Sequence, residues 1–94
     1  GDDVVRKMIY RRLSTMPGSY FHLATDEFGV GLKIKEVLRG SSLPALKVKI
    51  DQEILREPGV LGVATTLSLS NGVLQIKASV RTASGNTETI IEAR

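Results

Sequence analysis

Hydrophobic and polar residues alternate from Val60 onward, which is the period of a β-strand with one buried face. Asn71-Gly72 interrupts the alternation and favours a two-residue hairpin turn, because both residues tolerate a positive φ. A hairpin closed by Ser70 and Val73 sets large apolar side chains opposite one another on one face, and a slip of one residue would destroy that match. The predicted cross-strand pairs are Leu69 with Leu74, Leu67 with Ile76, Thr65 with Ala78 and Val63 with Val80.

A third strand is predicted from Thr87 to Ala93, after a second turn at Ser84-Gly85-Asn86. Ile90 and Ile91 are adjacent, so one of them must point away from the core. As the last strand it should lie at an edge of the sheet, where unpaired backbone groups invite another strand unless Pro or Lys blunts them. Neither residue occurs in this segment. We therefore expect an exposed edge that offers a partner Thr87, Thr89, Ile90 and Ile91.

The first half of the chain has helical spacing in three places. A helix over residues 3–14 is predicted to end before Pro17-Gly18, and a longer one should run from about residue 43 to Glu57. Between them, the apolar spacing predicts a short helix from about Val30 that Gly40 ends. The predicted fold class is therefore α+β, with three N-terminal helices followed by a three-stranded antiparallel meander.

The segment from Leu13 to Leu32 has neither period, although it holds three of the chain's four aromatic residues. Connectors longer than about 12 residues are usually functional or disordered, and the apolar mass of this one predicts an ordered element. Tyr20, Phe21 and Phe28 are therefore expected to pack within the molecule or to contact a partner, since aromatic residues often dominate binding.

Length and composition predict one domain over residues 1–94 with a single small core. The chain has no cysteine and no run near 18 apolar residues, so we expect neither disulfides nor a membrane-spanning helix, and a soluble protein. The net charge of +3 is spread along the chain and aromatics make up only 4%. Both numbers argue against a nucleic-acid partner, although Arg6, Lys7, Arg11 and Arg12 could reach phosphates.

No group of residues has the spacing of a catalytic or cofactor site. Glu53 and Glu57 lie one helical turn apart, but glycoside hydrolysis needs carboxylates that flank a substrate groove, so an ion pair or a solvated surface explains them better. His22 is the only histidine, which leaves a metal site or a nucleophilic triad unsupported. Gly29-Val30-Gly31 lacks the spacing of a phosphate-binding loop. The residues predict a binding protein, not an enzyme, with no metal and no cofactor.

Three short motifs, taken in order, resemble a known family. The first predicted helix ends in Leu-x-Thr-x-Pro-Gly over residues 13–18, the next loop holds Phe28-Gly29, and the longer helix ends in Glu57-Pro58 before the alternating strands. With the predicted order of elements, they resemble the W-type baseplate proteins of contractile phage tails, which are also called sheath initiators. The likeness extends from about Val4 to Ile91.

The resemblance implies a structural protein of the virion tail baseplate, assembled in the host cytoplasm as six copies around the tail tube. Each copy would bind wedge proteins, and its terminal strand would be the template for the first ring of sheath subunits. The family's Glu-Pro-Arg triplet, which helps to lock the core bundle of the wedge, stands here as Glu57-Pro58-Gly59. Glu57 and Pro58 carry over, whereas Arg56 could replace the arginine only by pointing elsewhere. The family is sometimes labelled lysozyme-like, which leaves glycan hydrolysis as one alternative function and a small nucleic-acid-binding module as another.

Overall fold

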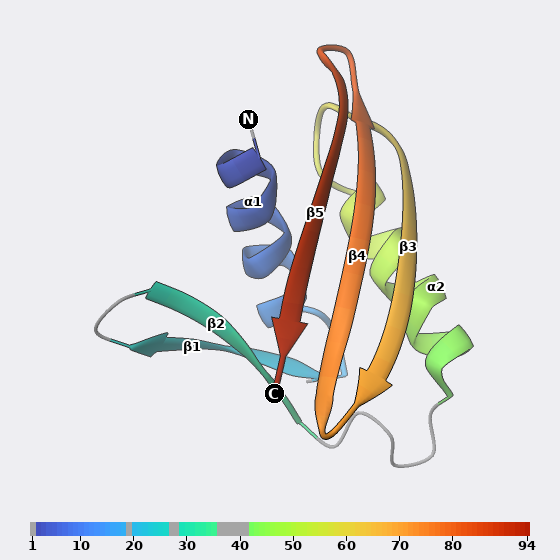
Figure 1. The fold of residues 1–94 in the computed structure, drawn as a ribbon. Coiled ribbons are helices and arrows are strands. Elements are labelled where there is room, and N and C mark those ends of the chain that lie inside the picture. The colour runs from blue at the N-terminus through green and yellow to red at the C-terminus, as the bar shows by residue number, and fades with distance from the viewer. Residues whose placement is uncertain (1, 19, 27–28, 36–41) are drawn as a thin grey trace.

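The computed structural model of the chain describes residues 2–18, 20–26, 29–35 and 42–94. Within them, two helices and five strands follow one another as α1 (Asp2–Ser14), β1 (Phe21–Asp26), β2 (Gly29–Ile34), α2 (Leu43–Leu55), β3 (Val60–Ser70), β4 (Val73–Thr82) and β5 (Gly85–Ala93). The strands form one sheet in the order β1-β2-β5-β4-β3 (Figure 1). Neighbouring strands are antiparallel except β2 and β5, which run parallel.

The strands β3, β4 and β5 form a meander whose first hairpin has the predicted register. Asn71 and Gly72 have φ values of +52° and +77°, as the two central residues of a primed hairpin turn require. The second turn lies one residue earlier than predicted, and β5 already begins at Gly85, whose φ is +130°. All four predicted pairs are present: Leu69 with Leu74, Leu67 with Ile76, Thr65 with Ala78 and Val63 with Val80.

Both described helices lie on the same face of this meander (Figure 1). In α1, Arg6 Nε donates a hydrogen bond to Thr89 Oγ1 at 3.1 Å, and Thr65 Oγ1 donates one to Asp51 Oδ1 in α2 at 2.7 Å. Thr65 and Thr89 are the two cross-strand neighbours of Ala78. Directly opposed residues of an antiparallel pair point to the same face, so both helices cover that face.

The helices agree with two of the three predicted ones to within two residues at each end. Ser42 caps α2 by accepting a hydrogen bond from the backbone N–H of Ala45 at 3.3 Å, and Pro44 occupies the first turn, where its missing N–H costs nothing. The apolar stripes of both helices enter one core. They bury Met8, Ile9 and Leu13 from α1 and Leu46, Ile50 and Ile54 from α2.

Residues 21–26 and 29–34 form the paired strands β1 and β2, where the sequence predicted a loop and the start of a helix. The spacing of Val30 and Ile34 fits a helical period and a strand period equally well. Pairing with the C-terminal end of the chain favours the strand, because Ile34 N donates to Arg94 O at 2.6 Å and Arg94 N donates to Leu32 O at 3.1 Å. The predicted helix is wrong where the structure describes it, and its end at Gly40 lies outside the described residues. The fold of three N-terminal helices and a three-stranded meander is therefore wrong.

The strand order places β5 inside the sheet and not at its edge. β4 pairs with β5 along its length, and β2 covers its C-terminal end through the parallel pairing of Leu32 with Ala93. The edges are β1, of six residues, and β3, of eleven. β3 contributes only Thr65 to the buried residues, consistent with its place at the margin of the core.

Candidate functional site

Glu57, which the sequence singled out at the end of the longer helix, binds α1 and not a neighbour on α2. Its Oε2 accepts a hydrogen bond from Arg12 Nε at 2.7 Å, and its Oε1 accepts one from Arg11 Nη2 at 3.1 Å. The residue lies two positions after the end of α2, held by a backbone bond from Glu57 N to Ile54 O at 3.0 Å. The carboxylate therefore ties the end of α2 to the last turn of α1.

Arg12 joins a second carboxylate to the same cluster. Its Nη1 lies 3.3 Å from Glu53 Oε1, and its Nη2 donates to the backbone oxygen of Arg56 at 3.3 Å. The hydrogen bond to Glu57 raises the pKa of Arg12, with Glu53 adding to the rise and desolvation opposing it. Both carboxylates thus face a permanent cation. The contacts of both carboxylates are ion pairs that join the two helices.

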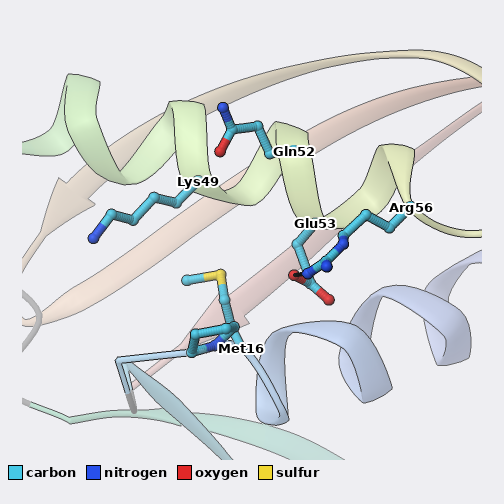
Figure 2. Close-up of a pocket in the computed structure, with 6 residues that line it drawn as sticks. Met16, Lys49, Gln52, Glu53 and Arg56 are labelled. Carbon is cyan, nitrogen blue, oxygen red and sulfur yellow. Dashed lines mark hydrogen bonds and ion pairs between the residues drawn. The ribbon is translucent and has the colours of Figure 1, made fainter.

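Arg56 borders a surface groove of about 390 Å³ between α2 and the segment that follows α1. Figure 2 shows Glu53 and Arg56 meeting on the side of α2 that faces Met16, with Lys49 extending to the left. Arg56 Nη1 lies 3.5 Å from Glu53 Oε2, and the Arg56 side chain is 68% exposed. The two residues therefore form a weak, solvated ion pair. The groove combines an apolar floor with charges that already have partners, which suits a protein contact better than a reaction. The lining residues are Met16, Pro17, Lys49, Gln52, Glu53 and Arg56.

Pro58 borders a second groove, of about 400 Å³, on the other side of Glu57. Apolar side chains from the start of α1 line it, among them Val4, which is 69% exposed. Gly59, which stands where the resembled family has arginine, has a φ of +93°. This conformation favours glycine, so an arginine there would be strained. The cations beside Glu57 are Arg11 and Arg12 of α1.

The aromatic residues of the segment between α1 and β2 are placed in different ways. Phe21 is 2% exposed and belongs to the core. Tyr20 is half-buried, and Lys49 both donates a hydrogen bond to its hydroxyl and lies 4.6 Å from the centre of its ring. Gly18, with a φ of +97°, sits under that ring, where a Cβ would come within 2.7 Å. Phe28 lies outside the described residues.

Of the four residues predicted to offer an edge, only Ile90 is well exposed, at 49%. Thr89 and Ile91 point into the core at 4% and 0%, and Thr87 lies half-buried beside the second groove. Adjacent Ile90 and Ile91 do point to opposite faces, as alternation predicts. β5 lies between β4 and β2, and its one pairing with β2, that of Leu32 with Ala93, comes after these four residues.

The sequence analysis missed the edge that is open, which is β3. Its segment, Val60–Ser70, contains no charged residue and no proline, and Leu61 and Leu69 are 60% and 41% exposed. A groove of about 280 Å³ follows it, lined by Leu43, Pro44, Lys47, Thr65, Thr66 and Leu67. The lack of charge was visible in the sequence. The predicted meander also places this strand at an edge, and the structure shows that neither β1 nor β2 pairs with it.

In the part of the chain that the structure describes, no three acidic or histidine side chains gather as a metal site, and neither helix has the length and apolarity needed to cross a membrane. Comparison with known protein families, curated proteins and solved structures finds no match to the chain.

Proposed function

We propose that the chain is a structural component of a contractile tail baseplate, joining wedge proteins around the tail tube and presenting a sheet edge to the first ring of sheath subunits. The observation that carries the proposal is β3, an eleven-residue edge strand without charge or proline. Such an edge gives an added strand its affinity through backbone bonds and its specificity through alternate side chains. The motifs at residues 13–18 and at Glu57-Pro58 support the same family of proteins.

The wedge contact is assigned to the groove beside Pro58 and not to the carboxylate of Glu57. That carboxylate is already bound by Arg11 and Arg12, so its role is to hold α1 against the end of α2. The groove then offers Val4, Val5 and Met8 next to Pro58. Apolar side chains in a preformed groove are the usual anchors of a protein interface.

The test places a charge on the open edge. Deleting residues 87–94 is unsuitable, because β5 buries Ile91 and Ala93 and its loss would unfold the core. Leu69→Lys adds a cation to the exposed end of β3, while Gln75→Lys adds the same charge on the outer face of the neighbouring strand β4. Electron microscopy should show tubes without sheath for Leu69→Lys and normal sheath for Gln75→Lys.

Sheathed tubes at wild-type frequency with Leu69→Lys would refute the proposed role of β3. A turbidity assay on peptidoglycan and a nucleic-acid binding titration near 50 mM salt cover the two alternatives, glycan hydrolysis and counterion-dependent binding. We expect neither lysis nor binding, because the glutamates are held in ion pairs and the basic residues of α1 include two that bind Glu57.

A further inference from the structure

The long, uncharged edge of β3 is a liability for the isolated chain. Natural sheets protect such edges with charges, prolines or bulges, and an unprotected one pairs with another strand. In β3 the only such device is an irregularity between Val60 and Gly62, at one end. The nine residues from Gly62 to Ser70 remain regular. The other edge strand, β1, is shorter and carries His22 and Asp26.

The backbone groups that face the open edge can be assigned from the hairpin. The residues that close a two-residue turn exchange hydrogen bonds, and bonded pairs then alternate along an antiparallel ladder. Ser70 therefore exchanges backbone hydrogen bonds with Val73 of β4. The residues two and four positions before Ser70 bond in the same way to their own partners in β4. The remaining residues aim their N–H and C=O groups outward. They are Val63, Thr65, Leu67 and Leu69.

We propose that, in solution, the β3 edges of two copies of this chain pair antiparallel about a two-fold axis through Thr66. Thr66 is the centre of the regular segment, so this register uses all nine residues. It sets Val63 opposite Leu69 of the second copy and Thr65 opposite Leu67, matching every outward backbone group. No charge occurs in β3, so no register brings like charges together. This inference concerns the chain alone and does not rest on the baseplate proposal.

The surface beside the edge fits the same occupant. In the proposed dimer the helix-covered faces of the two sheets lie on the same side. The α2 helix of each copy therefore flanks the paired β3 strands. α2 carries Pro44 in the groove beside β3, and one turn later Val48, which is 53% exposed. Four of the seven large apolar side chains that are exposed in the described residues lie on α2 or β3: Val48, Leu55, Leu61 and Leu69. Pairing of β3 would cover the apolar side chains near the axis.

Cysteine crosslinking tests the axis directly, since the chain has no cysteine. In Thr66→Cys the two thiols would face each other in a non-hydrogen-bonded pair, where Cβ atoms are about 4.5–5.5 Å apart, close to disulfide distance. Ser68→Cys is the matched control on the same exposed face. Its two thiols would be four residues out of register, about 13 Å apart along the strands. Mild oxidation should link Thr66→Cys into a dimer and leave Ser68→Cys unlinked.

Sedimentation of the purified chain gives the second measurement. The wild type should be a dimer, and Leu69→Pro, which removes an outward N–H without touching the β4 ladder, should raise the dimer Kd at least tenfold. Val48→Glu should also weaken the dimer, while Gln75→Glu on the outer face should not. Circular dichroism checks that each variant folds. A monomeric wild type, a polydisperse aggregate, or equal crosslinking of both cysteine variants would overturn the inference.

Discussion

The two hairpins of the sheet, β3–β4 and β1–β2, are held in different ways. The first combines a full alternation with an Asn71-Gly72 turn, and its register agrees with the sequence pattern. In the second, among the side chains that the structure describes, Phe21 and Leu32 enter the core, whereas Leu23 is 42% exposed. Figure 1 shows β1 and β2 running outward from the rest of the sheet. Local sequence is thus sufficient for one hairpin, while docking is required for the other.

The largest expected effect comes from removing the anchor of the second hairpin. Phe21→Ala should lower the free energy of unfolding by about 3–5 kcal/mol, because a fully buried ring leaves a cavity. Leu23→Ala, in the same strand, should cost less than about 1 kcal/mol, since that side chain is partly solvated. Urea denaturation of both variants checks the prediction, and equal losses would mean that β1 is held along its whole length.

Ile91 and Ile90 provide the matching test in the meander. Ile91→Ala should cost about 2–4 kcal/mol, because the side chain is fully buried, whereas Ile90→Ala should cost less than about 1 kcal/mol on the exposed face. Thermal denaturation separates the two. Similar losses for both isoleucines would contradict the assignment of the two faces of β5.

Gly18 lies shortly before the hairpin of β1 and β2. Gly18→Ala should cost about 2 kcal/mol, since the φ of +97° strains any other residue and the new Cβ would meet the ring of Tyr20. Gly31→Ala in β2 is the control, because its Cβ would meet nothing within 4 Å. Denaturant titration should find that control within about 0.5 kcal/mol of the wild type. A tolerated Gly18→Ala would show that the turn before β1 is not a determinant of the hairpin.

The smallest effect on the free energy of unfolding is expected at the turn between β3 and β4. Gly72→Ala should cost about 1 kcal/mol through its φ of +77°, with open space around the new methyl group. Asn71→Gly should be nearly neutral, since glycine also accepts the φ of +52° found there. Stability curves of the two variants test whether the turn contributes less than the cross-strand pairs. A loss at Gly72 that exceeds the loss at Phe21 would reverse the comparison.

The candidate site was predictable only in part. The motif drew attention to Glu57 and Pro58, but the cations that bind Glu57 come from 45 and 46 residues earlier in the chain. On the sequence those arginines are indistinguishable from a solvated face of α1, because a long-range ion pair leaves no local pattern. At Gly59 the φ of +93° favours glycine, a conformation that the sequence alone does not reveal.

The sequence by itself determined α1, α2 and the register of β3 with β4, because these depend on periods and turn residues within a few positions of one another. The tertiary structure decided that residues 29–34 form a strand and that β5 lies inside the sheet, since both depend on the meeting of Leu32 with Ala93. That contact joins distant segments, and no local propensity encodes it. By placing β2 against β5, it also leaves β3 as the long open edge of the molecule.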